Sequence, residues 1–247
     1  MSFLAIIGGT GLTRLPEFEI IRREKVATPY GDPSADLTFG KLYGQDIVFL
    51  ARHGEKHAVP PHRINYRANI WALKQSGANG ILAVAAVGGI RADMAPGKIA
   101  IPGQLIDYTY GRAHTFFEDD LDHVIHIDFT QPYSPQLREK LLNAAAVAGL
   151  SVIDGGVYGC TQGPRLETPA EITRMERDGC DLVGMTGMPE AALAREAGMD
   201  YACCAVVANW AAGRGHEEIS MPEIEANLAR GMADLSLLLK SLFAAWA

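Results

Sequence analysis

The residues best suited to chemistry in this sequence lie where apolar runs end. The run "YACCAVVAN" closes on the side-chain amide of Asn209, and only Trp210, Ala211 and Ala212 follow it. A continuous apolar run of this length is typical of a strand buried on both faces. We therefore expect this strand to deliver one amide, which both donates and accepts hydrogen bonds, to a cleft.

A second polar group follows the apolar run "DIVFLA". Arg52 and His53 come directly after it, and ligands of α/β proteins collect at the carboxyl ends of strands. A guanidinium offers two parallel donors to a phosphate and an imidazole adds another, although an arginine here could equally form a surface ion pair. His53, His57 and His62 do not predict a metal site, because two prolines interrupt them and no helix holds two at the required spacing.

A glycine turn follows the first predicted strand, "FLAII". A dinucleotide fingerprint would need glycine at position 14, where the chain has Arg14, and Pro16 replaces the expected helix. This disfavours an oxidoreductase built on the turn. The turn and the hydroxyl of Thr10 suit a single phosphate-sized anion, and a purely structural turn is the alternative.

Two further groups stand beside predicted element ends. Glu167 precedes the helix-starting pair Thr168-Pro169, where an acid is also favoured by the helix dipole alone. Met185 and Thr186 close the short run "DLVGM" at another carboxyl end. The chain contains no GxSxG motif, so a serine hydrolase finds no support.

The elements that must position these groups predict an α/β fold. Short apolar runs alternate with helical patterns in the second half, which indicates one mixed, twisted central β-sheet flanked by helices. We expect a single domain over residues 1–247, with residues 112–133 as an irregular surface excursion. Strands are predicted at 3–7, 37–43, 46–51, 80–87, 97–109, 151–159, 181–185 and 201–209, and helices at 64–78, 134–149, 168–179, 188–198 and from about 221 onward.

Composition limits the partners. Hydrophobic residues make up 48% of the chain and charged residues 21%, as in an ordinary globular protein, and the net charge of -7 carries no basic stripe for nucleic acid. The N-terminus has neither a signal peptide nor a membrane span, which predicts a cytoplasmic protein with no membrane partner. The cysteines at 160, 180, 203 and 204 are expected to be buried, reduced thiols.

Several motifs together resemble the trimeric purine nucleoside phosphorylase family, in its 5'-methylthioadenosine phosphorylase branch. The similar stretches are "IIGGTGL", "RHG" with "NYRANIWAL", "PGKIAIPGQLIDYT", "QGPRLETPAE" and "GMTGMPEAALAREAG". The resemblance implies a homotrimer that salvages purines by phosphorolysis, with inorganic phosphate as co-substrate and no metal or organic cofactor. It also implies that phosphate binds Thr10, Arg52, His53, the backbone N–H of Ala86 and Thr186, and that Met185 and Leu166 contact the nucleoside.

The base site departs from that branch. The methylthioadenosine enzymes carry two aspartates at the positions of Asn209 and Ala211, whereas this chain is similar to the 6-oxopurine phosphorylases, in which an asparagine and the glutamate at 167 recognise the base. The reaction implied is phosphorolysis of S-methyl-5'-thioinosine to hypoxanthine and 5-methylthioribose 1-phosphate. Phosphorolysis of inosine or guanosine, or of methylthioadenosine through an atypical base site, stays open, and a non-catalytic nucleoside-binding protein is disfavoured by the complete phosphate set.

The second open question is which group the enzyme accepts at the 5' end of the nucleoside, a hydroxyl or a methylthio group. Enzymes of the family for ordinary inosine place a histidine near the start of the last helix, where this chain aligns Met221 and Ile224, apolar surfaces that suit a methylthio group. Both could equally be helix-core residues. His126 matches a family position that reaches the 5' end from a neighbouring subunit.

Overall fold

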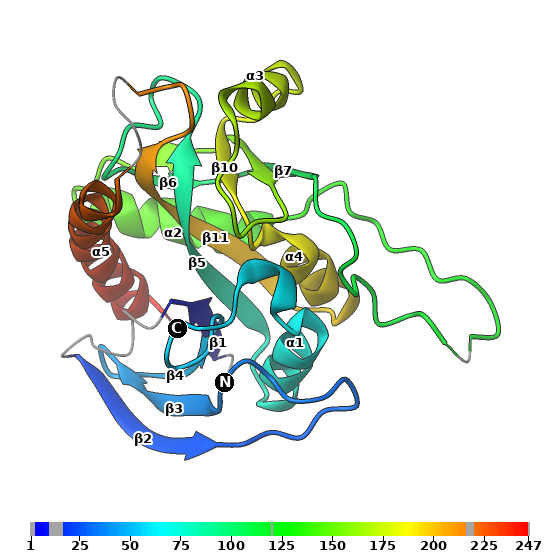
Figure 1. The fold of residues 1–247 in the computed structure, drawn as a ribbon. Helices are drawn as coiled ribbons and strands as arrows, with labels where there is room; N and C mark the ends of the chain where they lie inside the picture. Colours follow the sequence, from blue (N-terminus) through cyan, green and yellow to red (C-terminus); the bar gives the residue numbers. More distant parts are fainter. Residues whose placement is uncertain (1–2, 10–16, 120, 216–219, 247) are drawn as a thin grey trace.

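The computed structural model describes residues 3–9, 17–119, 121–215 and 220–246, and in this part of the chain one mixed β-sheet runs through the whole molecule (Figure 1). Its spatial order is β2-β3-β4-β1-β5-β10-β9-β7, with β11 beside β5, and with β6 and β8 beyond β11. The strands are β1 (Leu4–Gly8), β2 (Phe18–Glu24), β3 (Leu37–Leu42), β4 (Gln45–Ala51), β5 (Gly80–Gly89), β6 (Ile99–Ile101), β7 (Gln104–Asp107), β8 (Ile153–Asp154), β9 (Val157–Cys160), β10 (Leu182–Gly184) and β11 (Asp200–Trp210).

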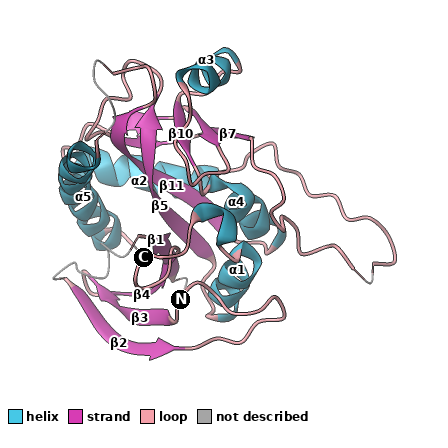
Figure 2. Cartoon of the chain, in the orientation of Figure 1, coloured by secondary structure: helices cyan, strands magenta, loops and turns pink. Residues whose placement is uncertain are grey.

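Helices cover both faces of the sheet (Figure 2). Helices α1 and α4 pack on each other on one face, α2 and α5 pack together on the other, and α3 stands at the β9–β10 end. Their bounds are α1 (Tyr66–Gln75), α2 (Pro135–Val147), α3 (Pro169–Arg177), α4 (Gly187–Glu196) and α5 (Met221–Ala244), with a short 3-10 turn, η2, at Pro61–Arg63. None of the helices described here is long and apolar enough to cross a membrane.

The pleat of the central strands explains their unbroken apolar sequences. Successive side chains of a strand point to opposite faces. On β11, Cys203 and Val207 enter the core under α1 and α4, while Cys204 and Val206 enter the core under α2 and α5. All four cysteines are buried and unbridged, as expected. Because both faces of the strand are covered, neither could be polar.

Local capping chemistry fixes where the helices begin. The side chains of Ser134, Thr168 and Ser220 accept from backbone N–H groups three residues on, at the starts of α2, α3 and α5. At Thr168 the bond is reciprocated by Glu171, which completes a capping box. The predicted helix starts at 134, 168 and about 221 are therefore confirmed.

Two predicted strands are each divided. The expected strand at 97–109 is β6 and β7, because Pro102 has no N–H for a ladder bond and the N–H of Gly103 bonds to Gly156 instead. The expected strand at 151–159 is β8 and β9, divided where Gly155 and Gly156 adopt φ of 86° and 95°. Each break lets the chain leave one neighbour strand and join another.

The excursion at 112–133 has no helix or strand in its described residues and reaches away from the body of the molecule (Figure 1). The prediction that this excursion lies on the surface is wrong at its first residue, since Arg112 is only 8% exposed. Phe116 and Phe129 also pack against the core, and the carboxylate of Glu196 on α4 accepts from the N–H of Phe116 at 2.7 Å. The excursion is thus fastened at its base.

Candidate active site

A cavity of about 760 Å³ opens where the carboxyl ends of the central parallel strands meet. β1 is parallel to β4 and β5, and β11 is parallel to β5, so their ends share one edge, the usual ligand position in such sheets. Apolar side chains dominate the lining, with few polar groups, as in small-molecule sites. Of the predicted site residues, those that line the cavity are Arg52, His53, Ala86, Leu166, Glu167, Met185, Thr186, Asn209 and Ile224.

Arg52 is held inside the protein at one side of this cavity. Its guanidinium donates from Nε and Nη2 to the carboxylate of Glu190, at 2.7 and 2.8 Å, and from Nη1 and Nη2 to the carbonyls of Val84 and Ile7. Four of the five N–H groups of an arginine are thereby used, which leaves one for an anion. Burial lowers the pKa of Arg52, but the adjacent Glu190 carboxylate outweighs burial and the pKa is raised.

His53 presents an acceptor nitrogen to the cavity side. Burial, reinforced by the charge of Arg52, lowers its pKa to about 4, so the ring is neutral at pH 7. Nδ1 lies 2.9 Å from the carbonyl oxygen of Val59. A carbonyl can only accept, so Nδ1 carries the proton and Nε2 carries the lone pair.

Of the three other predicted phosphate contacts, Ala86 and Thr186 line the same cavity. Ala86 is the exposed residue of β5, in a strand otherwise buried along its length. Thr186 is 7% exposed at the start of α4, and its hydroxyl does not cap that helix. Thr10 lies outside the described residues, although Gly9 beside it lines the cavity.

A β-bulge aims Asn209. The pairing of β11 with β5 shifts register between Val207 and Asn209, so that Ala208 is the extra residue. The carbonyl of Ala208 accepts a 2.8 Å bond from Nδ2 of the buried Asn227 on α5, which holds the bulge in place. Nδ2 of Asn209 donates one hydrogen to the carbonyl of Trp210 at 2.6 Å.

Glu167 is oriented from β9. The hydroxyl of Thr161, the first residue after that strand, donates to Oε1 of Glu167 at 2.6 Å. Met185 packs over the same loop, and a Cβ at Gly163 would collide with its sulfur, so only glycine fits there. The position of the Glu167 carboxylate in the cavity lining is therefore set by its hydrogen bond to Thr161.

The far side of the cavity comes from α5 and is mostly apolar. Ile224 contributes to it together with Leu228, Ala229 and Met232, and Glu225 is the one charged residue of α5 in the lining. Met221 is 63% exposed and is not a lining residue. Ile224 and Leu228 lie four apart on one face of α5 and both line the cavity, whereas Met221, one turn earlier at the start of the helix, lies beyond the cavity in solvent.

His126 is exposed on the excursion and does not line the cavity within the chain. No grouping of three or more His, Cys, Asp or Glu residues suited to a metal ion is found among the described residues.

Sequence analysis missed three residues of the site. Glu190 reads as an ordinary helix acid, Thr161 as a strand-end residue and Arg112 as part of a surface loop. No local signal distinguishes them, because their partners lie 138, 6 and up to 76 residues away. The absence of a nearby acid for Arg112 is the one hint that could have been noticed.

The fold and the cavity define a class of protein: an α/β protein whose site lies at the carboxyl ends of the central strands and is large enough for a nucleoside. The chain belongs to the phosphorylase superfamily, whose family model matches residues 3–244. A protein of Pseudomonas syringae named probable S-methyl-5'-thioinosine phosphorylase is 56% identical over 99% of this chain and all of its own length. A probable 6-oxopurine nucleoside phosphorylase of Thermococcus kodakarensis is 47% identical over 97% of this chain and 91% of its own.

Solved structures agree with this family. The methylthioadenosine phosphorylase from Schistosoma mansoni, in complex with adenine, superposes with a TM-score of 0.93. It is 31% identical in sequence, and the match covers 99% of this chain and 91% of the other. The predicted fold class, a nucleoside phosphorylase-like α/β fold, is confirmed.

Proposed function

We propose that this protein catalyses the phosphorolysis of S-methyl-5'-thioinosine to hypoxanthine and 5-methylthioribose 1-phosphate. The observation that carries the proposal is the pair Glu167 and Asn209 in one cavity lining, with Ala211 where the methylthioadenosine branch has a carboxylate. The closely similar relatives bear the name of this activity, which supports the proposal.

The hydrogen-bonding pattern of this pair matches a 6-oxopurine. Hypoxanthine presents an acceptor at O6 and a donor at N1–H, whereas adenine presents an amino donor and an N1 acceptor. The second Nδ2 hydrogen of Asn209 can donate to O6 while its Oδ1 accepts from N7–H, and Glu167 can accept from N1–H. With adenine, the Glu167 carboxylate would face the N1 lone pair, at a cost of about 1–3 kcal/mol.

The chemical step needs positioning and charge stabilisation only. A phosphate oxygen forms a bond to C1' as the C1'–N9 bond breaks, and the bonding electron pair moves into the purine. The leaving base becomes neutral when N7 takes a proton from solvent water, and Oδ1 of Asn209 accepts a hydrogen bond from that N7–H. Catalysis thus comes from holding phosphate and base on opposite faces of an oxocarbenium-like ribose.

Neutral His53 suits a protonated phosphate. Phosphate near pH 7 carries at least one P–OH group, and the lone pair on Nε2 can accept from it. Arg52 supplies its one remaining N–H, while Ala86 and Thr186 add an N–H and a hydroxyl.

The apolar side of the cavity suits a methylthio group. Ile224, Leu228 and Met232 offer carbon and sulfur surfaces against which a methylthio group can be buried, and Glu225 is the one charged residue of α5 beside them. A second candidate, phosphorolysis of inosine or guanosine, is favoured by the relatives named 6-oxopurine nucleoside phosphorylase.

One assay tests the proposal. The protein is incubated with methylthioinosine, methylthioadenosine or inosine, with and without phosphate, and the free base is followed. We expect release of hypoxanthine from methylthioinosine, strictly dependent on phosphate. Turnover without phosphate contradicts phosphorolysis, preferential release of adenine contradicts the base assignment, and a preference for inosine selects the second candidate.

We also propose that the enzyme is a cytoplasmic homotrimer. The exposed apolar residues Leu121, Val124 and Ile125 on the excursion, next to His126, supply a surface that a second copy could cover. Light scattering after size exclusion gives the mass in solution, and a monomeric mass contradicts the proposal.

A further inference from the structure

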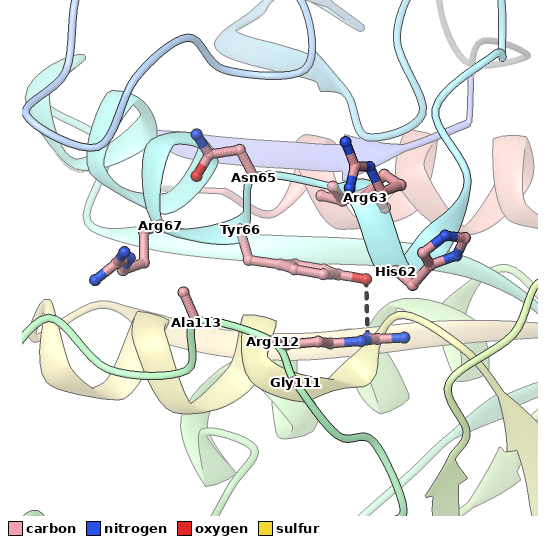
Figure 3. A pocket seen from close by; sticks show the side chains of 9 residues that line it. His62, Arg63, Asn65, Tyr66, Arg67, Gly111, Arg112 and Ala113 are labelled. Atoms are coloured by element: carbon pink, nitrogen blue, oxygen red, sulfur yellow. Dashed lines mark hydrogen bonds between the residues drawn. The ribbon is translucent and has the colours of Figure 1, made fainter.

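Arg112 lies at the base of the excursion, where its guanidinium is surrounded by oxygen atoms. Figure 3 shows the Arg112 side chain alongside that of Tyr66, whose hydroxyl accepts from Nη1 at 3.1 Å. Both residues line a small second cavity of about 220 Å³. Its other acceptors are the carbonyls of Met185 (3.0 Å), Met188 (2.5 Å), Thr161 (3.2 Å) and Gln162 (2.9 Å) and the side-chain oxygen of Gln162 (3.1 Å).

All of these acceptors are uncharged. Arg112 is only 8% exposed and has no carboxylate beside it. The free-energy cost of burying its charge must therefore be offset by hydrogen bonds. Three of the bonds satisfy backbone carbonyls of loop residues outside the sheet ladders, and the fourth satisfies the carbonyl of Met188 in the first turn of α4. Only the planar guanidinium of an arginine presents five N–H donors in fixed directions. It therefore constrains the distance between the segments whose carbonyls it binds.

The joined loops are the two sides of the main cavity. The carbonyls of Thr161 and Gln162 belong to the segment after β9, whose Thr161 hydroxyl orients Glu167. The carbonyls of Met185 and Met188 belong to the segment after β10, which flanks Thr186.

A third segment is joined through Tyr66. Its hydroxyl accepts from Arg112 and donates to the carbonyl of Pro61 at 3.1 Å. Pro61 lines the main cavity and ends the loop that begins at His53. One guanidinium therefore spans the base side, the phosphate side and the His53 loop.

We propose that Arg112 is a positioning residue that sets the distance between the base side and the phosphate side of the cavity. The proposal rests on the proposed phosphorolysis at this cavity. Arg112 does not line the cavity itself; it contacts the carbonyl of one lining residue, Met185, and otherwise acts through the two loops. Turnover of every nucleoside then depends on it in the same proportion, because the spacing of the reactants changes and the recognition of the base does not.

The test compares Arg112→Lys with the wild type. A lysine keeps the charge but reaches one loop at a time, so each half-site survives while their spacing relaxes. We expect kcat per folded site to fall by about tenfold to a hundredfold, the size of effect that a misplacement of about 1 Å produces. KM for phosphate and nucleoside should change less than threefold, and the ratio of kcat/KM for two nucleosides should stay constant.

Arg138→Lys is the matched control. Arg138 also donates to backbone carbonyls, those of Pro102 and Ile101, but at a position away from the cavity. Folded sites are counted by circular dichroism and by the stoichiometry of hypoxanthine binding. Arg138→Lys should keep wild-type kcat per folded site, whereas a merely structural role for Arg112 would lower the fraction folded and leave kcat per folded site unchanged.

Three results overturn the proposal: an unchanged kcat per folded site in Arg112→Lys, a loss confined to KM, or a shifted base preference. If Arg112→Lys does not fold, Tyr66→Phe decides, since it removes only the hydroxyl between Arg112 and Pro61. We expect a roughly fivefold lower kcat in that variant, the effect of one hydrogen bond, and wild-type kcat overturns the proposal. A wild-type protein that cleaves no purine nucleoside refutes the proposed function instead, before any variant is compared.

Discussion

Arg52 and Glu190, 138 residues apart in sequence, form a two-point ion pair that is 2% and 0% exposed. Tyr201 donates a further 2.9 Å hydrogen bond to Oε1 of Glu190. The arginine that follows β4 is therefore fastened to α4 and β11, and the pair joins three elements at the floor of the cavity.

Glu190→Gln should be strongly destabilising, because it leaves a buried guanidinium without its counter-charge. We expect a loss of about 3–5 kcal/mol in the free energy of unfolding, measured by urea denaturation. Asp46→Asn, which breaks the exposed pair between Lys41 and Asp46, is the control and should cost less than about 1 kcal/mol. Equal losses in the two variants would contradict the structural role of the buried pair.

Thr161→Val should weaken recognition of a 6-oxopurine, because the Glu167 carboxylate loses the donor that orients it. A hydrogen bond to a charged group contributes about 1.5 kcal/mol or more, so kcat/KM for methylthioinosine should fall at least roughly tenfold. Thr161→Ser keeps the hydroxyl and should stay within about twofold of wild type. If the valine and serine variants behave alike, the hydroxyl has no role in base recognition.

Asn209→Asp combined with Ala211→Asp should move the preference toward the 6-amino substrate. Two carboxylates would then face N7–H and the amino group of adenine, and an oxygen at position 6 would meet an acceptor. We expect the ratio of kcat/KM for methylthioinosine over methylthioadenosine to fall at least about tenfold. The control is the double variant Asn209→Asp with Ala212→Asp, which places the second carboxylate one residue further along. An equal shift in this control would mean that position 211 does not determine the choice of base.

Ile224→Asn should raise KM for the methylthio substrate by about tenfold, since a polar side chain replaces apolar surface at the α5 side of the cavity. KM for inosine should rise far less. Leu237→Gln, a change on the exposed part of the same helix, should alter neither value. Parallel increases of KM for both nucleosides would argue against a methylthio pocket at Ile224.

His53 should stay neutral far below the ordinary range of histidine. Its Cε1–H resonance in a proton NMR titration should move with a midpoint near pH 4, because burial and Arg52 lower its pKa to about 4. The unfolded chain binds this proton from about pH 6.5 downward, so the contribution of His53 to stability is full above pH 6.5 and is lost between 6.5 and 4. A midpoint near 6.5 would contradict the assigned neutral ring and its Nε2 acceptor.

The secondary elements were largely predictable because their causes are local. Ser134 and Thr168 cap helices by reaching three residues along the chain, and the apolar run of β11 follows from burial on both faces. The divisions of the strands at 97–109 and 151–159 were missed. Pro102 and Gly155 signalled the breaks, but which neighbour each half would join depended on distant strands.

The sequence by itself determined the α/β class and the carboxyl-end positions of Arg52, Thr186 and Asn209, because side-chain alternation and the end of an apolar run are properties of neighbouring residues. Only the tertiary structure decided that Arg52 is neutralised by Glu190 and that Arg112 spans the loops around the cavity. Those contacts join residues 49 to 138 positions apart, and they form only once the sheet has brought the strand ends together.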